Sequence, residues 1–221
     1  MYNTAPEGSL SLQILGQEHW LLPQKAIFRP ADRLLLLADL HIGKAAHFRK
    51  HGIAIPSEVN RNNFLNLSLL FDRVKPEQVL FLGDLSHSSS NMEWYEFTDF
   101  LALYPHIQFR LVAGNHDILS PELYTSAGVI STPILLEDQF GFIHDVADKQ
   151  ADDTRFYFSG HVHPAAKLYG KGRQSARVPC FWMNPKGMVL PAFGDFTGKH
   201  TIEPAKSDRV FAVAGNTCLE V

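Results

Sequence analysis

Residues 34–41 read Leu-Leu-Leu-Leu-Ala-Asp-Leu-His, an apolar run that stops at two side chains able to bind a metal ion. The run is short and lacks helical spacing, so it predicts a buried β-strand. Asp39 and His41 stand two positions apart, and in an extended chain such residues point to the same side. The segment therefore predicts a strand that delivers two chelating ligands at its carboxyl end.

Four further apolar runs have the same character and also end at residues that bind metal or move protons. These runs cover residues 79–82, 109–113, 140–143 and 155–159. They are followed, in order, by Gly83-Asp84, Gly114-Asn115-His116-Asp117, His144 and Gly160-His161-Val162-His163. In sheets covered by helices, ligands bind beyond the carboxyl ends of the strands. We therefore expect these side chains to converge on one rim and form a single site.

The segments around these strands predict helices and more strands. Ser57 can cap a helix over residues 57–74, and Asn91 can cap a second helix over residues 91–104. Residues 10–22 predict a hairpin, and the last third of the chain is mostly strand. This order predicts an α/β fold, a four-layer α-β-β-α sandwich of two mixed β-sheets with helices outside. No linker divides the chain, so we expect one domain over residues 1–221.

Composition narrows the classes of protein. The chain has 221 residues, 45% of them hydrophobic, which is enough for a substantial core. Its net charge is −3, so nucleic acid would have to be bound by local patches and not by bulk charge. Cys180 and Cys218 show no pairing pattern, and the chain has neither a charged apolar leader nor a membrane-length apolar run. We expect a cytoplasmic protein with no membrane segment.

The types of ligand indicate which metals the site would take. Imidazole and carboxylate groups without thiolate suit manganese, iron or zinc better than calcium or an iron–sulfur cluster. Asp84 follows a glycine at a strand end, where its two oxygens could bridge two ions roughly 3.5–4 Å apart. His161 and His163 again stand two positions apart, while Asn115 and His144 add an amide oxygen and another imidazole. With Asp39 and His41, these residues are about what two ions need while leaving positions for water and substrate.

The motifs, taken in order, resemble those of the calcineurin-like metallophosphoesterase superfamily: Asp39-x-His41, Gly83-Asp84-x-x-His87, Gly114-Asn115-His116-Asp117, His144 and Gly160-His161-x-His163. The resemblance implies two divalent ions at the strand ends, most often Mn²⁺, with iron or zinc as alternatives. It implies that one ion is held by Asp39, His41, Asp84 and His163, and the other by Asp84, Asn115, His144 and His161. It also implies that His116 donates a proton to the leaving oxygen, with Asp117 as its orienting partner.

Two further segments resemble the PdeM-type group of ligase-associated DNA damage response endonucleases. They are residues 38–44 and residues 190–198, and Lys199 stands where another glycine is expected in that group. The resemblance implies a manganese-dependent phosphodiesterase or nuclease. With the complete metal set, it leads us to expect a nuclease that acts on single-stranded DNA in DNA repair. It also implies a functional association with a DNA ligase, a helicase and an exonuclease.

Residues near the predicted site are candidates for holding the substrate. Lys44 stands three residues after His41 and is the strongest of these. Arg173 belongs to a second basic stretch, which also contains Lys167, Lys171 and Arg177. A solvated surface explains that second stretch nearly as well as a phosphate contact does, because charge runs usually face water. His87 fills the last position of its motif, where it would contact substrate or support a metal ligand from behind.

Other functions are compatible with the same metal site. A phosphomonoesterase, a protein phosphatase or a nucleotide-lipid pyrophosphatase would apply it to another substrate, because residues far from the ions select the substrate. A non-catalytic, metal-stabilised binding scaffold would keep the fold without the reaction. The intact ligand set favours an enzyme. His19, His106 and His200 lie outside the motifs, and we expect them to be ordinary polar or core residues.

Overall fold

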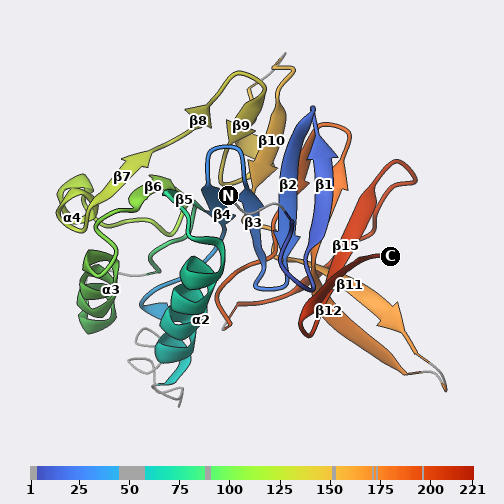
Figure 1. Ribbon diagram of the computed structural model, residues 1–221, viewed down its shortest axis with the longest axis horizontal. Coiled ribbons are helices and arrows are strands. Elements are labelled where there is room, and N and C mark those ends of the chain that lie inside the picture. The colour runs from blue at the N-terminus through green and yellow to red at the C-terminus, as the bar shows by residue number, and fades with distance from the viewer. Residues whose placement is uncertain are drawn as a thin grey trace.

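Two mixed β-sheets pack against each other in the computed structural model, which describes residues 4–44, 58–87, 91–150, 153–170, 172, 174–195 and 197–221 (Figure 1). The first sheet contains β1 (Leu10–Ile14), β2 (Gln17–Leu22), β3 (Ala26–Arg29), β4 (Leu34–Leu37), β5 (Gln78–Leu82), β6 (Gln108–Val112) and β7 (Val129–Thr132), adjacent in chain order. Its strands are antiparallel from β1 to β4 and parallel from β4 to β7. The parallel half carries four of the predicted ligands, Asp39, His41, Asp84 and Asn115, at the ends of β4, β5 and β6.

The second sheet is built from the later part of the chain. Its strands are β8 (Leu135–Leu136), β9 (Phe140–Phe142), β10 (Phe156–Ser159), β11 (Pro164–Tyr169), β12 (Ser175–Asn184), β13 (Gly187–Val189), β14 (His200–Thr201), β15 (Arg209–Ala214) and β16 (Thr217–Glu220). The order in space is β14-β11-β12-β13-β10-β9-β8, and β15 pairs with β12 and β16. The pairs β9–β10 and β10–β13 are parallel, so this sheet is mixed as well.

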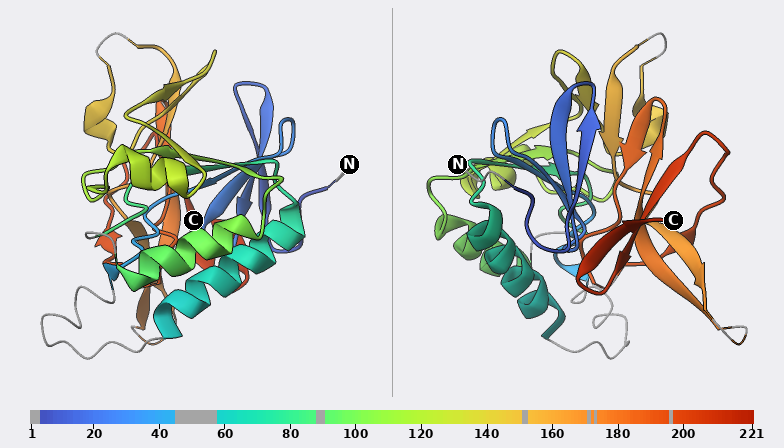
Figure 2. Two further views of the ribbon diagram at one scale, coloured as in Figure 1. Left: turned by 90° about the vertical axis from the view of Figure 1, so that its left-hand side faces the viewer. Right: turned by 45° about the vertical axis from the view of Figure 1, so that its right-hand side comes forward.

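Helices cover the outer face of the first sheet. Helix α2 (Glu58–Val74) and helix α3 (Met92–Ala102) lie side by side there (Figure 2). Asn91 caps α3 as expected, because its side chain accepts a hydrogen bond from the Trp94 backbone N–H at 3.2 Å. The predicted cap of α2, Ser57, lies outside the described residues. A short helix, α4 (Pro121–Ser126), precedes β7, and a 3₁₀ turn, η1 (Val146–Asp148), connects β9 to β10.

Side-chain alternation along β4 explains why its sequence is apolar at every position. Leu34 and Leu36 face the core between the two sheets, with Phe142 and Phe158 of the second sheet. Leu35 and Leu37 face the other way, into the core under the helices. A strand buried on both faces needs a continuous apolar run in place of alternation. The two separate cores, one between the sheets and one under α2 and α3, confirm the predicted α-β-β-α type of sandwich with two mixed sheets.

The elements outside the site agree with the prediction only in part. The hairpin over residues 10–22 is present, and its loop residues Leu15 and Gly16 both have positive φ, as a type I′ turn requires. Strands β3, β7, β8, β11 and β14 and helix α4 were not expected, because short segments carry too little periodicity to be recognised. In the part of the chain that the structure describes, no helix is both long and apolar enough to cross a membrane.

Candidate metal centre

The site lies where the parallel strands of both sheets end. Asp39, Asp84 and Asn115 follow the neighbouring parallel strands β4, β5 and β6. His144 and His161 follow β9 and β10, which are parallel neighbours in the second sheet. At this rim the sheets are joined by a bridge between Ala38 and Ala192. The strand ends of two sheets therefore meet, as the sequence predicts.

Backbone conformation sets the site residues apart from their surroundings. Five of them have φ in the left-handed region: Asp39 (56°), His41 (54°), Asp84 (48°), His161 (67°) and His163 (51°). Such a conformation in a non-glycine residue costs on the order of 1–3 kcal/mol and persists only where the surrounding structure enforces it. It turns each side chain away from the strand direction and into the space at the rim.

One cluster is formed by Asp39, His41 and His163, whose ligand atoms all lie within 4.8 Å of one another. The Nε2 atom of His163 is 3.5 Å from Asp39 Oδ1. Among the described residues, the buried Nε2 atoms of both His41 and His163 have no hydrogen-bond partner. Buried polar atoms normally have a partner, so two unpartnered imidazole nitrogens beside a buried carboxylate fit a cation site.

A second cluster is formed by Asp84, His144 and His161, again with ligand atoms within 4.8 Å of one another. His144 Nδ1 lies 3.1 Å from the Leu82 carbonyl oxygen. Because a carbonyl only accepts, Nδ1 carries the proton and Nε2 presents a lone pair. That Nε2 faces His161 Nδ1 at 3.1 Å, Asn115 Oδ1 at 3.1 Å and Asp84 Oδ1 at 3.4 Å.

Asp84 stands between the two clusters. Its Oδ2 is 3.8 Å from His41 Nε2, and its Oδ1 is 3.4 Å from His144 Nε2. One carboxylate thus directs one oxygen to each cluster, which is the geometry of a residue that bridges two ions. The clusters of histidine and aspartate are consistent with a dinuclear metal site.

Glycines make room for this arrangement. A Cβ at Gly83, whose φ is +77°, would lie 1.9 Å from His144 Nδ1. A Cβ at Gly114 would lie 2.5 Å from Asp84 Oδ1, and one at Gly160 would lie 2.7 Å from Asp39 Oδ2. All three distances are shorter than any ordinary contact of a Cβ atom. The glycines that precede the ligands in the sequence motifs are therefore needed for the close approach of the ligands.

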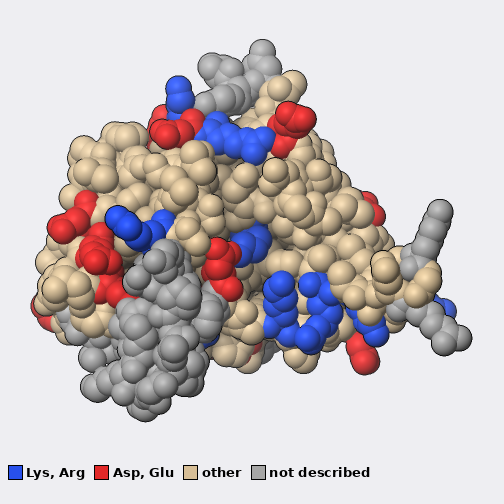
Figure 3. All heavy atoms as spheres, turned by 90° about the horizontal axis from the view of Figure 1, so that it is seen from below, with Lys and Arg blue, Asp and Glu red and all other residues tan. Residues whose placement is uncertain are grey.

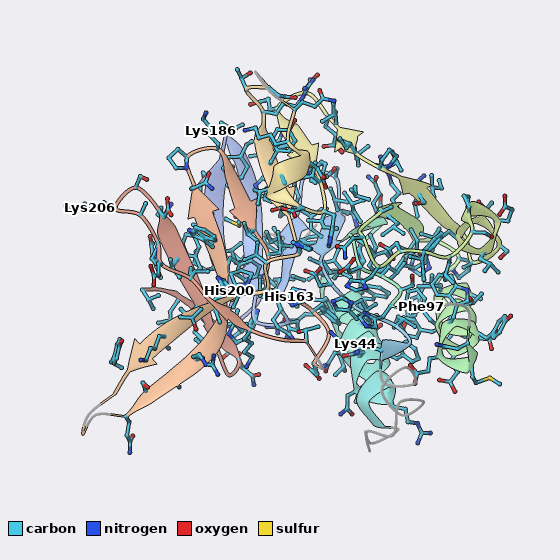
Figure 4. The ribbon with its side chains drawn as sticks, turned by 180° about the vertical axis from the view of Figure 1, so that it is seen from behind. Lys44, Phe97, His163, Lys186, His200 and Lys206 are labelled. Atoms are coloured by element: carbon cyan, nitrogen blue, oxygen red, sulfur yellow. The ribbon has the colours of Figure 1, made fainter. Side chains whose placement is uncertain are left out.

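Burial and nearby charge shift the pKa values of His41 and Lys44 at the site. Burial lowers the pKa of His41, and the positive charge of Lys44 lowers it further, so the ring stays neutral and able to bind metal. Burial also lowers the pKa of Lys44, an effect opposed by Asp84 and then Asp39. Lys44 and His163 lie at the same end of the sheets (Figure 4). Lys44, a predicted substrate contact, therefore lies near the carboxylates of Asp84 and Asp39.

Two more histidines adjoin the first cluster. His87 Nδ1 lies 3.2 Å from His41 Nδ1, so it contacts the ring nitrogen opposite the unpartnered Nε2. The His87 ring stacks on the His116 ring, with centroids 4.5 Å apart. The His116 backbone N–H donates to Asp84 Oδ1 at 3.0 Å. The contact with His41 Nδ1 favours a role for His87 in supporting this metal ligand over a role in contacting the substrate.

Asp117 is placed differently from expectation. Its carboxylate accepts hydrogen bonds from the backbone N–H groups of Ser86 and Gly114, both at 2.8 Å, and from the Tyr124 hydroxyl at 3.2 Å. Burial raises the pKa of Asp117, and the two backbone N–H groups oppose this shift. Among the hydrogen bonds of the described residues, none joins Asp117 to the His116 ring. Its contacts instead fix the loop that carries Asn115 and His116.

Sequence reasoning missed two charged residues at the site. Asp145 Oδ2 lies 3.5 Å from His161 Nε2, on the side of the ring away from His144. Its position directly after His144 in the sequence could have identified it as a site residue. Lys25 donates to the Phe193 carbonyl at 2.6 Å and to Asp195 Oδ1 at 3.2 Å. These two hydrogen bonds hold the segment after β13, which contains both residues, in position. Nothing in the sequence connects Lys25 with residues so far along the chain.

The predicted residues lie at the site, outside the described part of the chain, or elsewhere in the fold. The structure brings together all seven predicted ligands and places His116, His87 and Lys44 next to them. Arg173 lies outside the described residues. His19 is buried against the rings of Phe140 and Phe158, away from the motifs. A cavity of about 860 Å³ is lined by Arg33, His106 and other residues at the opposite ends of β5 and β6, and its lining includes none of the predicted ligands.

Comparison with known proteins places the chain among phosphoesterases. Residues 32–156 match a family model described as calcineurin-like phosphoesterase. The crystal structure of Pseudomonas putida nuclease MPE aligns with 96% of this chain and 100% of that chain, at 30% sequence identity and a TM-score of 0.79. A phosphoesterase from E. coli, Yfce, aligns with 85% of this chain and 97% of that chain, at 15% identity and a TM-score of 0.46.

No curated protein gives a significant match. The family model nevertheless covers more than half of the chain, and the nuclease structure covers nearly all of it. The chain therefore belongs to the calcineurin-like metallophosphoesterase family, and it is a phosphoesterase.

Proposed function

We propose that this protein is a metal-dependent phosphodiesterase that cleaves single-stranded DNA at a dinuclear centre. The observation that carries the proposal is the position of Asp84, with one oxygen toward His41 and the other toward His144. The similarity to a nuclease over nearly the whole chain supports nucleic acid as the substrate. A role in DNA repair beside a DNA ligase, a helicase and an exonuclease stays a prediction from the resemblance.

The ligands divide between the two clusters in this proposal. One ion would be held by Asp39, His41, Asp84 and His163, and the other by Asp84, Asn115, His144 and His161. Mixed oxygen and imidazole ligands without thiolate suit Mn²⁺, and they also accept iron or zinc. When bound, such a pair of ions supplies positive charge to the phosphate and lowers the pKa of a water molecule.

The chain's own residues would hold the substrate and move protons. His116 is half-buried, and its ring lies 5.6 Å from the His41 ring, at the edge of the first cluster. An imidazole can both give and take a proton, so His116 is suited to protonate the leaving oxygen. Lys44 lies near Asp39 and Asp84 and would contact a phosphate oxygen there. Asp117 would keep His116 in place through the loop backbone.

A panel of substrates tests this function. Protein loaded with Mn²⁺ should hydrolyse a bis-aryl phosphate and cut single-stranded DNA, and a chelator should stop both reactions. Hydrolysis of a monoester alone would favour a phosphomonoesterase. Absence of both diesterase activities at every metal concentration would refute the proposal.

One substitution separates catalysis from a binding scaffold. His116→Ala should lower kcat by about 10²–10⁴-fold, the usual contribution of a positioned acid, while the metal content stays unchanged. His106→Ala is the matched control, because His106 is exposed and lines the cavity at the far ends of the strands. Unchanged turnover in the His116 variant would remove that residue from the mechanism.

A further inference from the structure

The hairpin of β11 and β12 begins immediately beside the metal centre. Strand β11 starts at Pro164, the residue after His163, and runs antiparallel to β12. In the register of the pair, Lys167 lies opposite Arg177, and Tyr169 lies opposite Ser175. Because side chains alternate along a strand and opposed residues share a face, these four side chains lie on one face of the hairpin.

The two faces of the hairpin differ sharply in character. Ala166, Leu168 and Val178 lie on the other face and pack in the small core around Cys180. Lys167, Arg177 and Tyr169 are exposed, and Tyr169, at 77%, is the most exposed of the large hydrophobic side chains in the described residues. One face therefore anchors the hairpin, while the other presents two cations and an aromatic ring to solvent.

Within the described part of the chain, Lys167 and Arg177 form no ion pair with an acidic side chain. The ion pairs found among the described residues include neither Lys167 nor Arg177. The Lys167 ammonium lies 5.1 Å from the centre of the Tyr169 ring. Figure 3 shows the molecule from below, with a group of Lys and Arg side chains on the lower part of this face and a few acidic side chains beside it. The chain as a whole carries a net charge of −3, so this concentration of positive charge is local.

The cationic face is continuous with the metal centre. A cavity of about 260 Å³ is lined by His163, Lys199 and Pro179, among other residues. Pro179 lies opposite Ala165, two residues along β12 from Arg177, and so shares its face. At about 3.3 Å per residue, Lys167 is roughly 13 Å and Tyr169 roughly 20 Å along the strand from His163. Nucleotides in a stacked strand advance about 3.4 Å each, so about six of them, or fewer if extended, would span this distance.

We propose that this face of the β11–β12 hairpin is a binding track for the single strand whose phosphodiester enters the metal centre. Lys167 and Arg177 bind backbone phosphates, and Tyr169 stacks on an unpaired base. Cations that follow a backbone together with an exposed aromatic ring are the combination by which proteins hold single strands without regard to sequence. The inference rests on the proposed function and extends it from the scissile bond to the flanking nucleotides.

Binding in the absence of metal tests the track directly. Fluorescence anisotropy of a labelled 12-nucleotide single strand in chelator would compare wild type with Tyr169→Ala, Tyr169→Phe and the double variant Lys167→Ala/Arg177→Ala. Tyr169→Ala should weaken binding about 5- to 100-fold, and Tyr169→Phe should restore it, because the ring and not the hydroxyl stacks. The double variant should lower the slope of log affinity against log salt by about 1.4.

A matched control is Lys186→Ala. Lys186 is exposed and lies at the end of the second sheet away from the hairpin tip (Figure 4), so its removal should leave binding unchanged. The track is refuted if wild type does not bind the strand, if the hairpin variants bind as wild type does, or if Lys186→Ala loses as much. An equal loss for a blunt duplex would contradict stacking by Tyr169.

The two proposals fail in different ways. If wild type hydrolyses a bis-aryl phosphate with Mn²⁺ while the hairpin variants bind single strands normally, only the track is wrong. If wild type hydrolyses no diester, the proposed function is wrong.

Discussion

Gly83→Ala tests how tightly the second ligand cluster is built. The added Cβ would lie 1.9 Å from His144 Nδ1, so either His144 or the backbone must move. Movement of the ring breaks its hydrogen bond to the Leu82 carbonyl and takes Nε2 away from Asp84. The variant also carries the cost of a side chain at a φ of +77°, about 1–2 kcal/mol.

Gly128→Ala separates these two effects. Gly128 has a φ of +75°, close to that of Gly83, and a Cβ there meets nothing within 4 Å. Both variants should lose about 1–2 kcal/mol of unfolding free energy from backbone strain. For a chain of this size, that corresponds to a melting temperature lower by roughly 2–8 °C.

The metal content and the activity should differ between the two variants. Gly83→Ala should bind about one ion in place of two and lose at least about 100-fold in kcat/KM, because even residues that only orient a ligand are worth 10–100-fold. Gly128→Ala should keep both ions and full activity. Elemental analysis after desalting and hydrolysis of a bis-aryl phosphate measure the two quantities. The reasoning is refuted if Gly83→Ala retains two ions and wild-type activity.

Three further substitutions test the surroundings of the site and the core. His87→Ala removes the contact with His41 Nδ1 and should weaken metal binding about 10–100-fold in a chelator competition, whereas an unchanged affinity would deny it a supporting role. Tyr124→Phe removes a hydrogen-bond donor to Asp117 and should lower the free energy of unfolding in urea by about 1–3 kcal/mol. An unchanged free energy would show that the other donors to Asp117 are sufficient. His19→Leu tests acid stability. Burial lowers the pKa of His19 to about 4 from 6.5, so the unfolded chain takes up the proton first, and the folded state loses about 3 kcal/mol as pH falls through this window. The Leu variant should lack this loss in unfolding measured from pH 7 to pH 4, and an identical pH profile would contradict the assignment.

The sequence predicts the strands around the site well because of how they are buried. Leu34 to Leu37 alternate between two cores, so every position is apolar and the run stands out. Ligands at the ends of such runs could be expected to meet, because carboxyl ends of parallel strands share one edge. The ligand set was predictable for this reason.

The parts that escaped prediction depend on contacts between distant segments. Asp117 is next to His116 in sequence, which suggested a direct partnership, but the turn of the loop directs its carboxylate to Ser86 and Tyr124. Lys25 contacts Phe193, which lies 168 residues further along the chain. A single sequence contains no sign of such pairings, because no local periodicity or spacing reports them.

We propose that two cations lie on either side of Asp84. The most direct measurement is anomalous diffraction at the manganese edge from crystals of the protein grown with Mn²⁺. We predict two peaks roughly 3.5–4 Å apart, one between Asp39, His41 and His163 and the other between Asn115, His144 and His161. A single peak, or peaks that the Asp84 carboxylate does not bridge, would contradict the account.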